Sequence, residues 1–314
     1  MPYAPTVEPP QYGLTALAEQ LLPVLYRHRL MTTGQLHRLL QPHVVHPTYL
    51  RRQLTRLRER GLVDAVVRNR GGGQGQQAWY CTPAGADVVE AARELTARPY
   101  RMTEHNASSQ LQEHTLAVND TGIAFVEAAR AAGHDCGPLD WEPEVAHRFR
   151  DGEARADDDA FLTPDAVLSY VQRNGPRATA ITYFLEIDRA TEGPAQLADK
   201  LRAYARYQTY VPTAPVASRG RPDTGGEAWR GRYATFPLVL FVLTGATEAA
   251  MMRRAADVRA LAAADARLRR AAHRLPAGIT TLRQLQKFGP WEPVVTPVFG
   301  NNATPTNALS YAQS

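Results

Sequence analysis

Cysteine is scarce in this sequence of 314 residues, which contains only Cys81 and Cys136. The two cysteines are far apart and do not form the Cys-x-x-Cys pair that zinc sites and redox sites use. We therefore expect two reduced thiols in the core, because a disulfide-rich secreted domain needs several paired cysteines.

Long apolar runs are also missing. The longest apolar stretch, FPLVLFVLTG (236–245), is much shorter than the roughly 18 apolar residues that a membrane helix requires. The amino terminus, MPYAPTVEPPQYG, is polar and rich in proline, and it lacks the basic and apolar regions of a signal peptide. The sequence therefore predicts a cytoplasmic protein with no membrane partner.

Several catalytic signatures are absent as well. The glycine-rich stretch GGGQG (71–75) lacks the lysine and the following helix that a phosphate-binding loop requires. There is no Gly-x-Ser-x-Gly elbow of a serine hydrolase. No His-x-His pattern accompanies a tyrosine, so the histidine cluster of a relaxase is not indicated.

Charge is distributed unevenly along the chain. The formal net charge is +5, yet residues 27–70 contain ten arginines against only Glu59 and Asp64. Residues 140–165 are instead rich in acids. A concentrated basic segment attracts polyanions, so the two regions are expected to have different functions.

The basic segment has the element order of a winged helix-turn-helix domain. Helical spacing of leucines predicts helices over 14–30, 34–40 and 48–60, with Thr32 or Thr33 as a cap for the second. Two strand-like runs, 62–69 and 76–82, flank the glycine-rich stretch, and a helix from Pro83 follows. We assign residues 13–96 to this domain.

In a helix-turn-helix, the recognition helix enters the major groove of double-stranded DNA and its first residues reach base edges, while the wing contacts backbone or minor groove. An alternative is that the domain docks a protein and its arginines form a solvated face. The predicted DNA contacts are His46, Thr48, Tyr49, Arg51, Arg52, Arg56, Arg68 and Arg70.

The remainder of the chain predicts a second domain, of the α/β class with a mixed sheet, over residues 108–299. Residues 97–107 are expected to be a linker, and 1–12 and 300–314 to be disordered. A long helix (109–133) precedes a hairpin turned by Asn174-Gly175, then a helix from Pro194 and the apolar strand at 236–243, which we expect to be central. A helix over 246–273 covers one face of the sheet and is a candidate homodimer contact.

Three carboxylates are expected to meet at one end of the hairpin. If its loop comprises residues 174–177, Asp165 lies opposite Glu186, and Asp188 follows one strand period later on the same face. Gln196, Lys200 and Tyr204 form one stripe of the next helix. Oxygen-rich clusters favour Mg²⁺ or Mn²⁺, so Asp165, Glu186 and Asp188 are candidate metal ligands and all six residues are candidate catalytic residues. The alternative is a structural ion network in which the acids pair with Arg189, Arg202 or Arg206.

These residues resemble the motif of the restriction-endonuclease-like PD-(D/E)xK nucleases. Pro164-Asp165 matches the PD element and Glu186 matches the second acid. The sequence departs from the motif at Asp188, where the family has lysine, although some members carry that lysine on the next helix, as Lys200 would be here. The resemblance implies a restriction-endonuclease-like domain that cleaves DNA with Mg²⁺.

Over about residues 14–245 the chain is also similar to the replication-relaxation family of actinobacterial plasmids and mobile elements. The most specific elements are PDAVLSY, FLEIDRATE and KLRAYARY. This resemblance implies a DNA-binding protein of plasmid replication or processing, with Mg²⁺-dependent endonuclease activity as one hypothesis. The other hypothesis is a non-catalytic replication initiator or transcriptional regulator with a degenerate nuclease fold.

Overall fold

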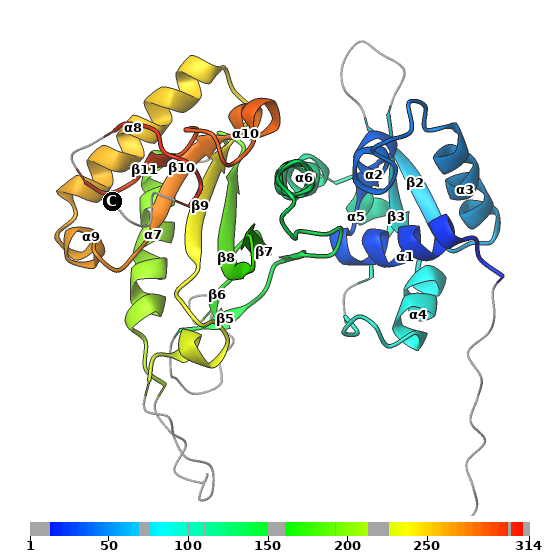
Figure 1. Ribbon diagram of the computed structural model, residues 1–314, viewed down its shortest axis with the longest axis horizontal. Helices are drawn as coiled ribbons and strands as arrows, with labels where there is room; N and C mark the ends of the chain where they lie inside the picture. Colours follow the sequence, from blue (N-terminus) through cyan, green and yellow to red (C-terminus); the bar gives the residue numbers. More distant parts are fainter. Residues whose placement is uncertain are drawn as a thin grey trace, which may run out of the picture. The chain divides into compact units, whose positions relative to one another are not determined.

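The computed structural model describes residues 13–68, 76–98, 101–109, 111–149, 161–191, 193–212, 226–300 and 303–309. The chain is a mixed α+β protein that divides into two compact units, unit 1 (Met1–Asn119) and unit 2 (Asp120–Ser314). In the described residues there are ten α-helices, a three-stranded sheet in unit 1 and a six-stranded mixed sheet in unit 2 (Figure 1). None of the described helices combines the length and the apolar composition needed to cross a bilayer.

Unit 1 has the order of elements that the sequence predicts. Three helices are followed by an antiparallel hairpin and a fourth helix, and a short strand after the first helix pairs with the second strand of the hairpin. The elements are α1 (Ala16–His28), β1 (Met31–Thr32), α2 (Thr33–Leu40), α3 (Thr48–Glu59), β2 (Val63–Arg68), β3 (Gln76–Cys81) and α4 (Pro83–Ala91).

Local sequence signals explain these boundaries. Thr32 accepts a hydrogen bond from the Gln35 backbone, and the Gln35 side chain accepts one from the Thr32 backbone, which makes a capping box at the start of α2. Thr82 caps α4, whose first residue is Pro83. The leucines of α3 are buried, so its arginines are left on the outer face.

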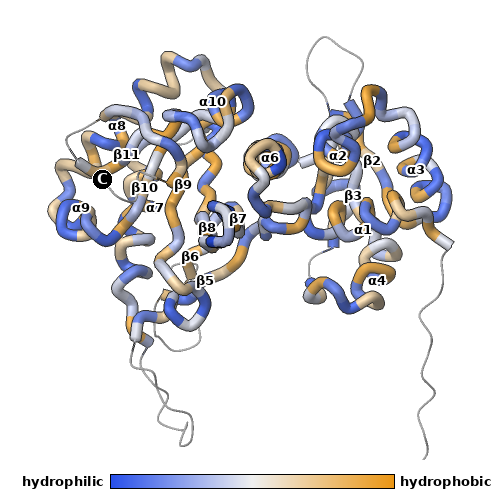
Figure 2. The backbone as a smooth tube through the Cα atoms, in the orientation of Figure 1, coloured by the Kyte–Doolittle hydropathy of each residue, from blue (hydrophilic) through white to orange (hydrophobic). Residues whose placement is uncertain are grey.

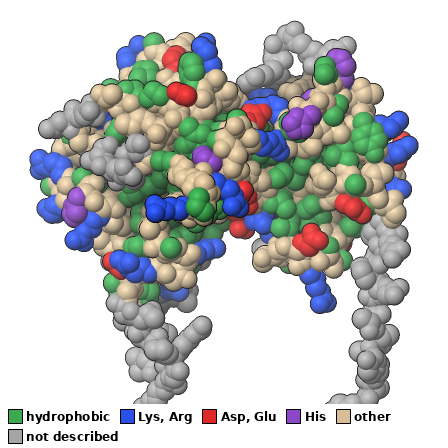
Figure 3. All heavy atoms as spheres, in the orientation of Figure 1, with side chains coloured by type: hydrophobic (Ala, Val, Ile, Leu, Met, Phe, Trp, Pro, Cys, Tyr) green, Lys and Arg blue, Asp and Glu red, His purple; other side chains and the backbone are tan. Residues whose placement is uncertain are grey.

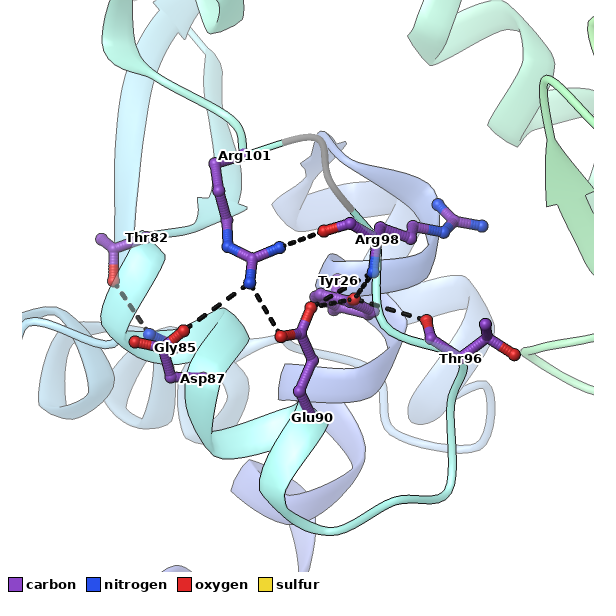
Figure 4. Close-up of polar contacts among 8 residues, drawn as sticks. All are labelled: Tyr26, Thr82, Gly85, Asp87, Glu90, Thr96, Arg98 and Arg101. Carbon is purple, nitrogen blue, oxygen red and sulfur yellow. Dashed lines mark hydrogen bonds and ion pairs between the residues drawn. The ribbon is translucent and has the colours of Figure 1, made fainter.

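A polar network joins α1 and α4 to the segment that follows α4 (Figure 4). The Tyr26 hydroxyl donates to Glu90 at 2.5 Å, and Arg101 donates to the other Glu90 oxygen at 2.7 Å. The Arg98 backbone N–H donates to the Tyr26 oxygen at 2.9 Å. Part of the expected linker is therefore held against the helices, and it continues into the short helix α5 (Glu104–Ala107).

In unit 2 the sheet has the strand order β11-β10-β9-β8-β7-β4. A separate two-stranded ladder joins β5 (His147–Arg148) to β6 (Phe161–Leu162). The strands of the main sheet are β4 (Trp141–Pro143), β7 (Ala166–Asn174), β8 (Arg177–Asp188), β9 (Leu238–Leu243), β10 (Ala277–Thr281) and β11 (Thr296–Pro297).

The register of the β7–β8 hairpin is confirmed. Ala166 pairs with Leu185 and Asn174 with Arg177, which places position 165 opposite Glu186. The predicted place of the apolar strand is also confirmed, because β9 runs parallel between β8 and β10 inside the sheet. It is coloured hydrophobic along much of its length in Figure 2.

Side chains of β8 alternate between two covered faces. Phe184 packs in a core with α7 (Pro194–Thr209) and α8 (Glu248–Ala264), and Glu186 and Asp188 follow on this same face. Tyr183 points to the other face, where its ring lies 5.0 Å from that of Phe125 in α6 (Gln112–Ala132). From Tyr183 onward both faces of the strand are buried, which explains the apolar run Tyr183–Leu185 before Glu186.

Three features of this region differ from the sequence predictions. The expected helix over 246–273 is broken at Asp265, which ends α8 and caps α9 (Ala266–Ala271) through its side chain. The sequence analysis also missed β10, α10 (Leu282–Phe288) and β11. In the tail expected to be disordered, residues 303–309 are described, and Ala308 is fully buried and accepts a hydrogen bond from Tyr183. A homodimer contact on the 246–273 segment stays a prediction.

The boundary between the units falls inside α6, a helix that the sequence analysis assigned wholly to the second domain. Its first part belongs to unit 1, where Gln35 donates to the Leu116 carbonyl and Asn119 donates to the Leu30 carbonyl, both at 2.8 Å. The other domain limits proposed from the sequence stay predictions.

We expect Gly122→Ala in α6 to destabilise unit 2, although alanine normally stabilises the interior of a helix by up to about 1 kcal/mol relative to glycine. A Cβ at Gly122 would lie 2.5 Å from a ring carbon of the fully buried Trp141. Urea unfolding should show a loss of about 1–3 kcal/mol, as overpacked cores do.

Gly231→Ala is the matched control, because no atom lies within 4 Å of a Cβ there. A smaller ring at Trp141, introduced by Trp141→Phe, should reduce the cost of Gly122→Ala in the double variant. Equal stability of Gly122→Ala and wild type would contradict this account of the contact.

Candidate functional site

Glu186 lies near the end of β8 with both carboxylate oxygens engaged by α7. Its Oε2 atom is 2.6 Å from the Lys200 ammonium, and its Oε1 atom accepts a 2.5 Å hydrogen bond from the Tyr204 hydroxyl. Glu186 and Tyr204 are buried, whereas the Lys200 side chain is 37% exposed. Lys200 and Tyr204, two of the three residues in the stripe predicted for this helix, therefore contact Glu186.

Burial controls the protonation of this carboxyl group. Loss of hydration raises the pKa of Glu186 to about 7; the Lys200 charge opposes this increase, and the negative charge of Asp165 adds to it. Burial also raises the pKa of Tyr204 well above its usual value, so the phenol is a hydrogen-bond donor at neutral pH. Glu186 is consequently an acid that changes its charge close to neutral pH.

Asp165 lies on the neighbouring segment, just before β7. Its Oδ2 atom accepts a hydrogen bond from the backbone N–H of Ile187 at 2.6 Å, and its carbonyl accepts one from Glu144 at 3.2 Å. The side chain therefore ties the start of β7 to the end of β8. Its electrostatic effect on Glu186 agrees with the predicted proximity of the two acids.

Asp188 is paired with α8 instead of α7. Its Oδ2 atom accepts a hydrogen bond from Arg254 in an ion pair whose side chains are 3% and 12% exposed. Its Oδ1 atom accepts from the Ala190 backbone at 2.9 Å. The structural-network alternative anticipated such pairing, but it named other arginines.

Arg202, one of the arginines named in that alternative, donates to Asp265 at 2.6 Å and not to the acids of β8. Gln196, the third residue of the predicted stripe, accepts a 2.7 Å hydrogen bond from the Gly193 backbone and closes the first turn of α7. It is exposed and acts as a helix cap in this structure.

This arrangement does not fit a hard divalent ion. Such an ion needs carboxylate oxygens that converge on one point, whereas Lys200 and Tyr204 take both oxygens of Glu186, and Asp188 points to Arg254. Among the described residues, no group of three or more His, Cys, Asp and Glu side chains is placed to hold a metal. The Mg²⁺ or Mn²⁺ prediction therefore gains no support from the donor geometry.

A second candidate surface is the outer face of α3. Leu50, Leu54 and Leu57 are buried, so the opposite side of the helix carries the cations. The guanidinium of Arg52 lies 5.0 Å from the Tyr49 ring centre. Blue side chains gather along this helix in Figure 3. The predicted contact residues that are exposed here are His46, Thr48, Tyr49, Arg51, Arg52 and Arg56.

Arg68, one of the two arginines predicted to contact DNA from the wing, is not exposed like the residues of α3. Arg68 forms a two-point ion pair with Glu113, with both contacts at 2.5 Å, and its side chain is only 12% exposed. Its guanidinium group is therefore used inside unit 1 and is not presented to a ligand. Arg70 lies outside the described residues.

The sequence analysis missed a buried histidine in unit 2. The Nε2 atom of His147 lies 2.6 Å from the Tyr233 hydroxyl, and its ring packs against Phe184 and Tyr207. Burial lowers the pKa of His147 to about 4, so the imidazole is neutral. In the sequence VAHRF, strand alternation places His147 on the same face as the apolar Val145 and Phe149. This pattern could have predicted that His147 is buried.

We expect Glu186→Gln to change how stability depends on pH. A carboxyl whose folded pKa is raised contributes stability below its unfolded pKa, and this contribution is lost as pH rises through about 7. Denaturant unfolding should show that wild type loses up to about 3 kcal/mol relative to Glu186→Gln between pH 4.5 and 7.5. The exposed Glu94→Gln is the control; parallel curves for wild type and Glu186→Gln would contradict the raised pKa.

Comparisons with known proteins identify one family. The family model described as Replication-relaxation matches residues 8–219, which include all of unit 1 from that point, the β7–β8 hairpin and α7. Searches of curated proteins and of solved structures gave no match. Since the matched region is more than half of the 314 residues, the chain belongs to the replication-relaxation family.

Proposed function

We propose that the protein is a non-catalytic DNA-binding protein of plasmid replication or relaxation, the role that its family suggests. In this proposal unit 1 is a winged-helix module that binds duplex DNA, and unit 2 has a nuclease-like architecture without nuclease chemistry. One observation carries the proposal: the exposed Arg51, Arg52 and Arg56 of α3 form no ion pair with a described acid, whereas Glu186 and Asp188 at the end of β8 are each paired with a cation.

The arrangement of unit 1 supports the winged-helix assignment. α2 and α3 are joined by seven residues (41–47), and the β2–β3 hairpin follows α3 directly and forms a sheet with β1. In this architecture α3 is the recognition helix, which inserts into the major groove, and the hairpin is the wing. The apolar side of α3 is occupied by core contacts, so only its basic side is available to a ligand.

The side chains on that basic side suit duplex DNA. Arg51 and Arg56 make no side-chain hydrogen bond or ion pair with any residue that the structure describes. An arginine can donate two hydrogen bonds to guanine or contact a phosphate, and Thr48 near the start of α3 is suited to a base edge. A protein-docking helix would instead present apolar anchors at its centre.

The ion pairs of unit 2 favour a non-catalytic role. A nuclease of the proposed type needs carboxylates that are open to metal and substrate, and here Glu186 is 2% exposed and Asp188 is 5% exposed. Their partners come from two different helices, which pins α7 and α8 to β8. The acids therefore act as buried structural ion pairs.

A Mg²⁺-dependent endonuclease is the second candidate function. The observation that favours it is the contact between Glu186 and Lys200, with Asp165 in register on the adjacent segment, as the motif resemblance requires. The geometry supports this candidate less, because no group of acidic side chains in the described ranges is placed to hold an ion.

We expect substitution of Arg51, Arg52 and Arg56 by glutamine to weaken duplex binding and its salt dependence together. Each lost phosphate contact lowers the slope of log K against log salt by about 0.9. Fluorescence anisotropy with a labelled duplex should therefore give a slope smaller by about 1–3 and at least a tenfold loss of affinity at low salt. Arg93→Gln, an exposed arginine of unit 1 outside α3, is the control; an unchanged slope in the triple variant would remove α3 from the interface.

Purified wild-type protein should not nick or linearise supercoiled plasmid when Mg²⁺ or Mn²⁺ is added. Glu186→Gln and Asp165→Asn should bind duplex DNA as wild type does, because neither residue lies on α3. Metal-dependent nicking that disappears in both variants would reject the non-catalytic proposal and establish the second candidate.

A further inference from the structure

A second basic surface lies on unit 2, around the short helix α9. Leu268 is fully buried and anchors the helix, so the residues around it point outward. Blue and purple side chains gather over this helix in Figure 3. We define the α9 surface as the exposed residues Arg267, Arg269, Arg270, His273 and Arg274.

Two acids beside this surface, Asp265 and Asp199, are already paired. Asp265 accepts hydrogen bonds from Arg202 and from the first backbone N–H groups of α9, and this pairing lowers the pKa of Asp265 to about 2. Asp199 forms an ion pair with the same arginine. By contrast, Arg267, Arg269 and Arg270 have no side-chain hydrogen bond or ion pair to the described part of the chain. The surface therefore has unbalanced positive charge.

A cavity of about 510 Å³ adjoins this surface. Alanines of α8 line it together with Ala272, Val298, Phe299 and Gly300, and two arginines, Arg259 and Arg269, also line it. Arg259 is held in place by a 2.9 Å hydrogen bond to the Pro297 carbonyl. Arg269 belongs both to the cavity and to the α9 surface, so an apolar hollow and a free cation are adjacent.

This combination fits a particular class of ligand. A nucleotide has a flat, weakly polar base and an anionic phosphate, and a single strand leaves its bases free to enter a hollow while the backbone follows a line of cations. Duplex DNA keeps its bases stacked inside, so it can use the cations but not the cavity. An acidic lipid surface could likewise contact only the cations.

We propose that the α9 surface and the adjoining cavity form a site for single-stranded nucleic acid, with the phosphates on Arg267, Arg269 and Arg270 and one base in the cavity. The site lies on unit 2 and is independent of the duplex contact proposed for α3. The protein therefore has separate contacts for paired and unpaired strands, which suits a protein that acts where a duplex is opened.

The test is anisotropy of a labelled oligothymidine, titrated with full-length protein at several salt concentrations. Replacing Arg267, Arg269 and Arg270 by glutamine should lower affinity at least tenfold and reduce the salt slope by about 2, since each phosphate contact to a single strand contributes about 0.7. The single variant Arg269→Gln should reduce the slope by about 0.7. Arg177→Gln, which removes an exposed arginine at the β7–β8 turn, is its charge-matched control and should leave the slope unchanged.

A second variant tests the cavity separately from the charge. Ala260 lines the cavity and is exposed, so Ala260→Trp can fill the space without disturbing the core. We expect it to weaken oligothymidine binding severalfold with an unchanged salt slope. Thermal unfolding of each variant checks that the fold is intact.

The outcomes separate this proposal from the others. The α3 variant should lose duplex binding and keep oligothymidine binding, so either proposal can fail alone. The single-strand site would be overturned if the α9 triple variant, or the Ala260→Trp variant, bound oligothymidine with the same affinity as wild type. If the α9 triple variant loses as much affinity for duplex DNA as for oligothymidine, the surface binds polyanions in general and the proposal fails. The proposal also fails if the triple variant no longer binds phosphatidylserine vesicles but still binds oligothymidine, which would identify a lipid-binding surface.

Discussion

The buried pairing of Glu186 with Lys200 and Tyr204 is the interaction on which the arrangement of unit 2 depends. A carboxylate inside a protein is costly unless its charge is neutralised and its oxygens are hydrogen-bonded. Here one oxygen faces an ammonium group and the other a phenol, so β8 and α7 are joined at one defined position. Asp188 repeats the arrangement with Arg254 and fixes α8 to the same strand. The order of strand and helices is thereby specified by charge as well as by apolar packing.

The same pairing separates the polar residues of the chain into two groups. The acids at the end of β8 are buried and paired with cations, so they hold the fold together. In the part of the chain that the structure describes, Arg51 and Arg56 of α3 and the arginines of α9 project outward and form no ion pair. An arginine without a partner inside the protein remains available to bind phosphate. We therefore assign nucleic-acid binding to the arginines of α3 and α9, and stabilisation of the fold to the acids of β8.

The resemblance to a nuclease motif therefore needs a physical qualification. Identical residue types at the right spacing can hold a metal or hold a helix, and the difference depends on which oxygens stay open. In the described residues each motif acid accepts a hydrogen bond from a side-chain or backbone donor. Because burial raises the pKa of Glu186 to about 7, its pairing changes with pH close to neutrality.

Much of the local structure was predictable from sequence because its causes are local. Thr32 and Gln35 cap a helix within four residues, and Asn174-Gly175 turns a hairpin whose register then follows by counting. The stripe of Lys200 and Tyr204 followed from helical periodicity. The break at Asp265 was not predicted, because helical propensity continues through it, and the side chain caps α9 while it also receives a hydrogen bond from Arg202 on another helix.

By itself, the sequence determined the order of elements in unit 1, the register of the β7–β8 hairpin and the family. Only the tertiary structure decided that Arg254 neutralises Asp188, that Arg68 is held by Glu113, and that α8 and Arg269 of α9 line an open cavity. The physical reason is that partners of a charge are chosen by distance in space, and residues 66 positions apart carry no periodic signal of their contact.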